Sequence, residues 1–221
     1  MSSRLISVLQ NYYPLFLEGV WGTLWISAVV VLFGSLLGGL FALGKMSSKK
    51  FITVPVNLLT EIIRGTPILL QLFFFSFGLS QISPIAFKEE VWIILALILN
   101  SSAYVAEVIR SGINAVNKGQ FEAAKSLGLS NKDMMVKIIL PQAVKNILPA
   151  LGNEFIMMVK ETSLAAFFFI PSLMTSESIV SGITYARTET LIITGLLYLM
   201  ITVPLSQLVQ RYERKLAQND K

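Results

Sequence analysis

From Gln120 to Ala143 the chain reads QFEAAKSLGLSNKDMMVKIILPQA, a charged interlude between two apolar halves. The Ala, Glu, Lys and Leu residues of Glu122–Leu127 favour a helix, and Gly128 suits the left-handed conformation that ends one. Ser130 offers an N-cap oxygen to a second helix, and Asp133 follows three residues later, as in a capping box. The sequence therefore predicts a short helix, a sharp turn and a new helix between apolar segments.

The composition is that of a membrane protein. Of its 221 residues 54% are hydrophobic and 14% are charged, and the mean hydropathy is +0.68. Soluble domains are usually about 25% charged. Because the sequence has neither Cys nor His, disulfides, most zinc sites and His-based acid–base catalysis are excluded. No cleavable signal peptide is expected, because the first apolar run is too long and only Arg4 precedes it.

Five apolar segments are long enough to cross a bilayer, which takes about 20 helical residues. After an amphipathic lead at residues 1–18, we expect spans at about 19–44, 52–79, 91–111, 141–170 and 190–210. The charged interlude then lies in a loop at about 112–140. The expected fold is an all-α membrane protein with five transmembrane helices, formed by a single domain over residues 1–221.

The second span is interrupted in its middle by Arg64-Gly65-Thr66-Pro67. Proline removes a backbone donor and kinks a helix. A broken helix inside a membrane is tolerated only where it meets protein or a water-filled cavity, so the break is expected to line a pathway. Glu61 lies one turn before Arg64, which favours an ion pair between the two near the cytoplasmic interface.

Basic residues indicate the orientation of the spans. Thirteen of the 18 Lys and Arg residues fall in the stretches 45–50, 110–145 and 211–221, all on one side. Cytoplasmic loops carry an excess of Lys and Arg, so this side is predicted to be cytoplasmic, with the N-terminus outside and the C-terminus inside. The net charge of +5 therefore reports topology, and no nucleic-acid partner is expected.

Polar side chains within the spans are candidates for substrate binding, because charged groups in a bilayer are unfavourable unless they pair or face water. Glu154 and Glu161 lie seven residues apart on one helix face, beside a stripe of Asn153 and Lys160. Carboxylates suit an ammonium or guanidinium group, and Lys160 suits an α-carboxylate. The competing interpretation is a Glu–Lys network that only holds helices together. The full candidate set is Glu154, Glu161, Lys160, Asn153, Thr162, Ser163, Glu107, Tyr104, Asn100, Gln71 and Thr66.

The order of residues in the charged interlude resembles the EAA loop of ABC importer permeases. Glu122-Ala123-Ala124, three residues, Gly128, nine residues, Ile138, one residue and Leu140-Pro141 match that loop without a gap. In the family this loop is the coupling helix, which docks into a groove on the cytoplasmic ATPase. The resemblance implies a coupling helix at Glu122–Leu129, where an ordinary amphipathic connector is the alternative. Its coupling residues would be Glu122, Ala123, Ala124, Leu127, Gly128 and Leu129.

Further stretches resemble the polar amino acid uptake permeases: RGTPILLQLFF at 64–74, SAYVAEVIR at 102–110, LPALGNE at 148–154 and VKETSLA at 159–165. The resemblance covers about residues 19–210, with one departure at Ser111-Gly112, where relatives often have Gly-Gly. It implies the type I (MetI-like) permease fold in the bacterial cytoplasmic membrane. It also implies a second permease subunit, identical or not, two ABC ATPases and an external solute-binding protein.

The charge balance of the candidate site favours a cationic substrate. Glu107, Glu154 and Glu161 outnumber Lys160, although Arg110 can instead neutralise Glu107. An unpaired buried carboxylate is unfavourable, so an incoming cation is preferred to an anion. A basic amino acid is therefore expected, and glutamine comes second because Asn and Gln side chains in the spans could bind its amide.

No catalytic residue, metal site or cofactor is expected on this chain. It has no Gly-Lys-Ser/Thr phosphate-binding loop, so ATP and Mg²⁺ are expected on the partner ATPase alone. The expected function is that of a permease subunit that moves a polar, basic amino acid across the membrane by alternating access. The alternatives are the same transporter class carrying glutamine, glutamate or another polar amino acid and, more distantly, a passive channel.

Overall fold

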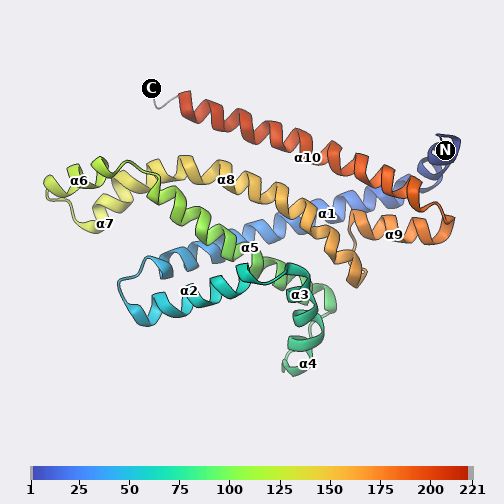
Figure 1. Ribbon diagram of the computed structural model, residues 1–221, viewed down its shortest axis with the longest axis horizontal. Helices are drawn as coiled ribbons and strands as arrows, with labels where there is room; N and C mark the ends of the chain where they lie inside the picture. The colour runs from blue at the N-terminus through green and yellow to red at the C-terminus, as the bar shows by residue number, and fades with distance from the viewer. Residues whose placement is uncertain (1, 219–221) are drawn as a thin grey trace.

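The computed structural model describes residues 2–218, which form helices joined by short turns, with no β-strand in that range (Figure 1). In chain order the elements are α1 (Ser2–Lys45), α2 (Lys50–Gly65), α3 (Ile68–Phe73), a π-helical segment (Phe74–Leu79), α4 (Ser80–Ile82), α5 (Glu89–Asn114), α6 (Lys118–Ser126), α7 (Asn131–Met134), a second π-helical segment (Met135–Ile139), α8 (Leu140–Glu161), a 3-10 segment (Thr162–Phe168), α9 (Leu173–Thr184) and α10 (Arg187–Gln218).

Within residues 2–218, four helices are long and apolar enough to cross a membrane. They are α1, α5, α10 and a continuous helix of 38 residues, Asn131–Phe168, that contains α7 and α8. A fifth span results if the bent pair Lys50–Gly65 and Ile68–Ile82 counts as one. The expected lead and first span are one uninterrupted helix, α1. The all-α fold with five membrane-crossing segments is confirmed.

Helix α5 lies at the centre of the bundle and packs along α1, α2 and α8. Its fully buried Ile93 and Leu97 meet Val30 of α1 and Met158 of α8 in one apolar cluster. These side chains are buried together, and their close packing holds α1 and α8 against α5.

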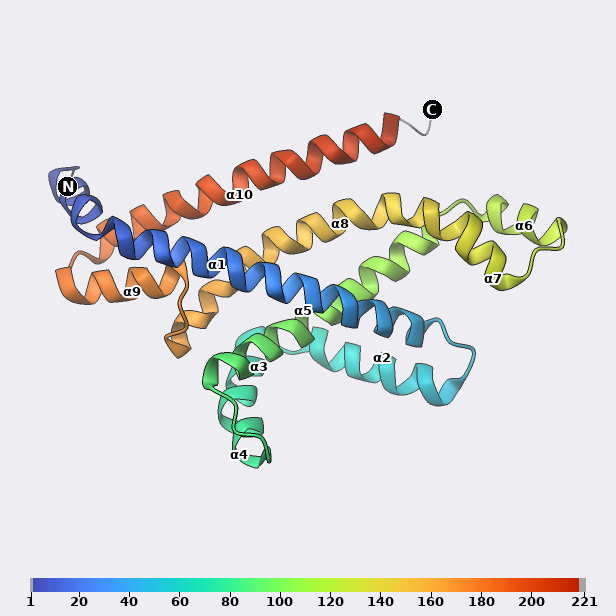
Figure 2. The same cartoon turned by 180° about the vertical axis from the view of Figure 1, so that it is seen from behind.

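The N-terminal turns of α1, helix α9 and the start of α10 form one end of the molecule (Figure 2). Phe16 and Val180 are buried there in a second apolar cluster. Glu177 of α9 is completely buried, and its Oε1 accepts a hydrogen bond from Thr190 Oγ1 of α10 at 2.8 Å. This carboxylate therefore ties α9 to α10.

Helices α6 and α7, residues 118–134, form a knob at the opposite end (Figures 1 and 2). Gly128 has φ +74°, which confirms the predicted left-handed turn. Ser130 Oγ accepts a hydrogen bond from the Asp133 backbone N–H at 3.1 Å, as predicted for an N-cap. The first helix of the knob runs over Lys118–Ser126 and so ends before the expected Leu129, because Gly128 stops it.

Candidate functional site

The break in the second span is a bend of 108° between α2 and the helical segment Ile68–Ile82. A helix end leaves carbonyl groups without partners, and side chains supply them here. Thr66 Oγ1 donates a hydrogen bond to the Ile62 carbonyl at 2.8 Å. Gln71 Nε2 donates to the Ile63 carbonyl at 2.7 Å and to Thr66 Oγ1 at 2.9 Å. The Gln71 amide therefore caps the broken helix from beyond the break.

A long-range contact holds this cap in place. Asn100 Nδ2 of α5 donates a hydrogen bond to Gln71 Oε1 at 3.0 Å, and Asn100 is 4% exposed. This hydrogen bond joins the break to α5 at the centre of the bundle. Both Nε2 and Oε1 of the Gln71 amide are therefore hydrogen-bonded. The side-chain oxygen of Asn100, Oδ1, makes no hydrogen bond to any residue in 2–218, so this oxygen can still accept one.

A cavity of about 200 Å³ opens beside the break. Three separate parts of the chain form it: the break itself, the middle of α5 and the end of α8. We call it the break cavity; it is lined by Thr66, Pro67, Ile68, Asn100, Tyr104, Met157, Met158 and Glu161. Four of the predicted substrate-binding residues therefore share one cavity: Thr66, Asn100, Tyr104 and Glu161.

Glu107 lies one turn beyond Tyr104 on α5 and is surrounded by cations. Lys45 Nζ donates a hydrogen bond to its Oε1, and Arg110 donates two to its Oε2, at 2.8 and 2.9 Å. The guanidinium of Arg64 approaches Oε1 at 3.5 Å. One carboxylate thus faces three positive groups, and we call these four residues the Glu107 cluster.

This cluster corrects two expectations. Arg64 contacts Glu107 on α5, whereas Glu61 is exposed and forms no ion pair with Arg64 within residues 2–218. Glu107 is neutralised by these cations, so the expected set of three carboxylates opposed only by Lys160 does not hold. The sequence could not distinguish these pairings, because it does not show that α2 packs on α5 with Arg64 toward Glu107.

Two of the other candidates are buried in helix contacts. Glu154 is 3% exposed, and its Oε1 accepts a hydrogen bond from Ser101 Oγ of α5 at 2.8 Å. Thr162 is fully buried, and its Oγ1 donates to the Val159 carbonyl at 2.8 Å. Neither side chain lines the break cavity, and Glu154 connects α8 to α5.

The remaining candidates lie elsewhere on α8 and the 3-10 segment. Asn153 lines a separate cleft of about 440 Å³ between α8 and α10, together with Lys145 and Glu213. Lys160 is exposed and is not a lining residue of the break cavity. Ser163 lines a third cavity, of about 160 Å³, near Arg187.

The predicted coupling residues lie on the knob. Ala124 is 1% exposed and packs against residues of α5 and α8, which fixes the knob to the bundle. Glu122, Ala123, Leu127 and Gly128 are exposed, and Leu127 is 79% exposed. Leu129 is partly buried against the same cluster as Ala124. The knob therefore has an inner face that anchors it and an outer face that is free.

Sequence reasoning missed the roles of Lys45 and Ser101. Lys45 ends the first apolar segment and was expected only to mark the cytoplasmic side, but its side chain reaches Glu107 and Thr60. Ser101 lies just before the motif at 102–110 and is not part of it, but its hydroxyl donates the hydrogen bond to Glu154. Helical periodicity gave no signal for Ser101, because adjacent residues of a helix point about 100° apart and Ser101 does not share the face of Asn100. Nothing local indicated Lys45.

The comparisons with known proteins agree with this architecture. A model of the family described as "binding-protein-dependent transport system inner membrane component" matches residues 31–218. The chain is 40% identical over 208 residues to the arginine transport system permease protein ArtQ of Bacillus subtilis, covering 94% of each. It is 38% identical over 218 residues to the putative glutamine transport system permease protein GlnP of Rickettsia conorii, covering 97% of this chain and all of that one.

Solved structures support the same conclusion. A crystal structure of an amino acid ABC transporter with histidines matches at a TM-score of 0.90 and 42% identity, covering 94% of this chain and 96% of that one. An inward-facing structure of the MetNI methionine ABC transporter matches at a TM-score of 0.69 and 18% identity, covering 90% and 96%, which confirms the MetI-like fold. The chain belongs to the family of binding-protein-dependent transport system inner membrane components, and within it to the amino acid ABC transporter permeases.

Proposed function

We propose that the chain moves a polar amino acid across the membrane through the break cavity, with a basic amino acid as the preferred substrate. The observation that carries the proposal is the carboxylate of Glu161 beside the side chains of Asn100 and Tyr104 in one cavity. Oxygens of all three can accept hydrogen bonds from an ammonium or guanidinium group. The relatives named for arginine and for glutamine transport are consistent with a polar amino acid as substrate.

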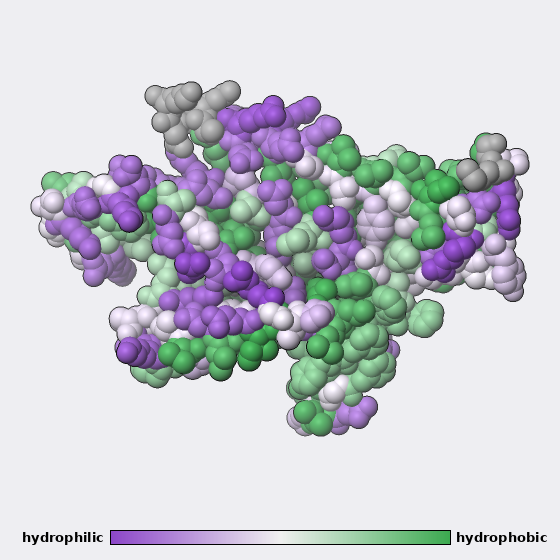
Figure 3. Space-filling view, in the orientation of Figure 1, coloured by the Kyte–Doolittle hydropathy of each residue, from purple (hydrophilic) through white to green (hydrophobic). Residues whose placement is uncertain are grey.

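A second permease subunit would complete the pathway. Polar side chains are exposed on membrane-crossing helices, among them Glu61 of α2 and Asn153 and Lys160 of α8. Hydrophilic residues cross the middle of the face seen in Figure 3. Such groups are unfavourable in lipid unless protein or water covers them. The break cavity of about 200 Å³ is also smaller than the roughly 300–1,000 Å³ of typical ligand pockets, so two copies facing each other would provide a site of sufficient size.

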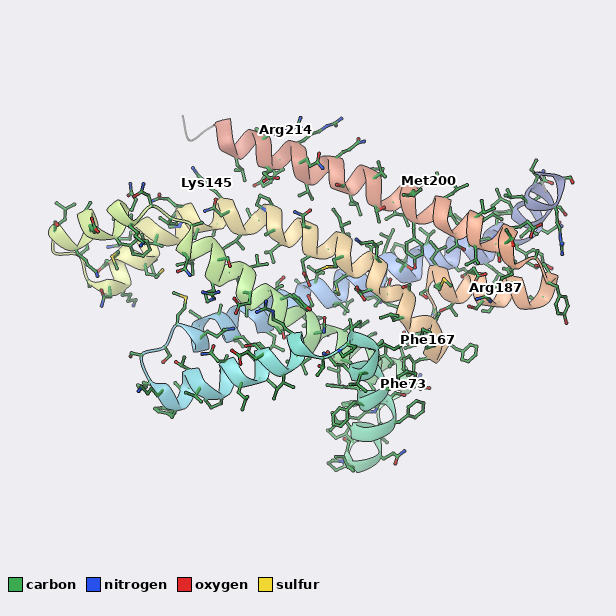
Figure 4. All side chains as sticks on the ribbon, viewed as in Figure 1. Phe73, Lys145, Phe167, Arg187, Met200 and Arg214 are labelled. Carbon is green, nitrogen blue, oxygen red and sulfur yellow. The ribbon has the colours of Figure 1, made fainter. Side chains whose placement is uncertain are left out.

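The knob would couple this pathway to ATP hydrolysis. Its exposed Leu127 and Glu122 offer an apolar anchor and a charged group to a groove on a cytoplasmic ATPase, one ATPase for each permease subunit. ATP and Mg²⁺ would be bound by that ATPase. Lys145 of α8 and Arg214 of α10 lie toward the knob end of the molecule, and Arg187 lies toward the opposite end (Figure 4). By the positive-inside rule the knob end is cytoplasmic, and the N-terminus and α9 face the external solute-binding protein.

Uptake by reconstituted transporter tests the proposal. The complex would be placed in liposomes with its ATPase and solute-binding protein, and ATP-dependent uptake of radiolabelled L-arginine, L-lysine, L-histidine and L-glutamine compared. We expect a basic amino acid to be taken up best. Glu161→Gln should lower its uptake at limiting concentration by about 10- to 100-fold, the effect of one lost charge-assisted hydrogen bond. Glutamine uptake should fall much less.

The outcomes separate the alternatives. Flux without ATP would indicate a passive channel, and glutamine uptake above that of every basic amino acid would indicate the second substrate class. Unchanged arginine uptake by Glu161→Gln would contradict the assigned cavity. An active complex of this chain and its ATPase with no other permease subunit would establish a homodimer.

A further inference from the structure

The Glu107 cluster contains more positive charge than its carboxylate can pair with. Both carboxylate oxygens of Glu107 already accept hydrogen bonds, one from Lys45 and the other from Arg110. Arg64 lies near the same carboxylate but at 3.5 Å, and it forms no hydrogen bond to any residue in 2–218. Arg64 is therefore the cation that this carboxylate holds least closely: it forms an ion pair without a hydrogen bond, so its donors can still bind another carboxylate.

The position of Arg64 is fixed by an aromatic ring. The centre of its guanidinium lies 5.7 Å from the centre of the Tyr104 ring, within the range of a cation–π contact. Tyr104 lines the break cavity, and so does Thr66, two residues after Arg64. The side chain of Arg64 is 40% exposed. A partly exposed guanidinium thus lies against Tyr104, one of the residues that line the cavity.

Glu161 lines the same cavity from α8. Helices α2 and α8 both run away from the knob end (Figure 1), α2 toward the break and α8 toward Glu161 at its last residue. The cavity therefore has a negative group, Glu161, on one wall, and a positive group lies against Tyr104 on another. A free amino acid carries the complementary pair of charges, an α-carboxylate and at least one ammonium group.

We propose that Arg64 binds the α-carboxylate of the transported amino acid as it occupies the break cavity. The assignment rests on the function proposed above and adds to it the group that recognises the anionic end of the substrate. A guanidinium presents paired donors that match a carboxylate in a two-bond arrangement. Neither Arg64 nor Lys160, the other candidate for this role, is a lining residue of the cavity. Of the two, only the side chain of Arg64 has a hydrogen-bond, ion-pair or ring contact with a lining residue within 2–218, the cation–π contact with Tyr104. The proposal predicts selectivity for substrates with a free α-carboxylate, whatever their side chain.

Two ligands that differ only at the α-carboxylate test the assignment. The purified complex of permease and ATPase would be titrated with L-arginine and with L-argininamide, in which a neutral amide replaces the carboxylate. The solute-binding protein is left out, so that its own selectivity does not enter. Arg64→Gln should weaken L-arginine binding by about 10- to 100-fold and change argininamide binding by less than about threefold. Arg64→Lys keeps the charge but loses the paired donors, so its loss should be smaller and still confined to L-arginine.

Arg110→Gln is the matched control, because it removes one positive charge from the same cluster but from a side chain already bonded to Glu107. It should affect both ligands alike. Equal losses for the two ligands in Arg64→Gln and Arg64→Lys, or no loss in either variant, would overturn the assignment while leaving the proposed function standing. A wild-type complex that binds no basic amino acid would refute the proposed function itself, and the assignment with it.

Discussion

The knob and the break cavity are both polar interruptions of an apolar chain, but they are built in opposite ways. The knob is convex, and hydrogen bonds between near neighbours in sequence shape it, such as that from the Asp133 backbone to Ser130. The break cavity is concave, and its polar walls, Thr66, Asn100 and Glu161, come from three distant segments. Local geometry therefore decides the shape of the knob, whereas helix packing decides the shape of the cavity.

One helix joins the two regions. The continuous segment Asn131–Phe168 begins in the knob and carries Glu161 of the cavity, over a length of about 55 Å at the rise of an α-helix. Under the proposed coupling, a displacement of the knob by a partner would be transmitted to the wall of the cavity along a single element. Changes in the knob should alter coupling, and changes in the cavity should alter selectivity.

Gly128→Val is expected to have the largest effect, and it acts on the knob alone. The left-handed φ of +74° at this position is strained for any β-branched residue, by about 1–3 kcal/mol. The chain should relieve this strain by moving α6 relative to α7. We expect ATP-dependent uptake in liposomes to fall by at least about tenfold while the complex still assembles and hydrolyses ATP. The measurement is the number of amino acids moved per ATP.

Gly128→Asn provides the control at the same position. Asn tolerates the left-handed region far better than Val, so uptake should remain near the wild-type level. A Cβ at this position meets no other atom within 4 Å, so size alone cannot explain a difference between the two variants. Normal transport by Gly128→Val would show that the turn is not needed for coupling.

The knob was predictable almost residue by residue, because its signals are local. The left-handed glycine and the Ser130 cap both lie where the sequence indicates, and only the ends of the first helix differ. An N-cap at Asn117, whose side chain accepts a hydrogen bond from the Gly119 backbone at 2.8 Å, starts this helix earlier than expected. Asn is among the preferred N-cap residues, so even this start had a signal in the sequence.

The cavity was predictable only as a set of candidates. Helical periodicity identified polar residues within the spans, but it gave Glu154 and Glu161 the same face of one helix. The structure separates them, because Ser101 of α5 meets Glu154, whereas the break of the second span leaves space at Glu161. The ion pair of Arg64 could not be predicted for the same reason, because Glu107 lies on another helix. Such distinctions depend on the packing of helices, which a single sequence does not specify.

Gly112→Ala is expected to have an intermediate effect, because it loosens the contact between α5 and α8. An added Cβ would lie 2.4 Å from Ile147 Cγ1 and 3.4 Å from the Ala143 carbonyl oxygen of α8. Such overpacking usually destabilises by about 1–3 kcal/mol. The thermal midpoint of the purified complex should fall by about 2–4 °C for each kcal/mol. L-arginine affinity should stay the same, because the break cavity lies further along α8.

Gly39→Ala is the control for this prediction. A Cβ there meets no atom within 4 Å, and alanine favours a helix over glycine, so the thermal midpoint should hold or rise. A lowered midpoint in Gly39→Ala equal to that in Gly112→Ala would mean that glycine replacement itself, and not the α5–α8 contact, is responsible. A changed L-arginine affinity in Gly112→Ala would contradict the separation between the two regions.

Glu154→Gln should have the smallest effect, and it tests whether Glu154 belongs to the substrate pathway. Glu154 lies on the same helix as Glu161, but it is 3% exposed and bonded to Ser101. Glutamine has nearly the same shape, and its carbonyl oxygen can accept the same hydrogen bond. We therefore expect uptake of L-arginine and of L-glutamine to change together, by no more than about threefold. Glu161→Gln, measured in parallel, should lower L-arginine uptake far more than L-glutamine uptake. If Glu154→Gln instead abolished L-arginine uptake and spared L-glutamine in a normally assembled complex, both carboxylates would belong to the pathway, and the contact with Ser101 would have to open during transport.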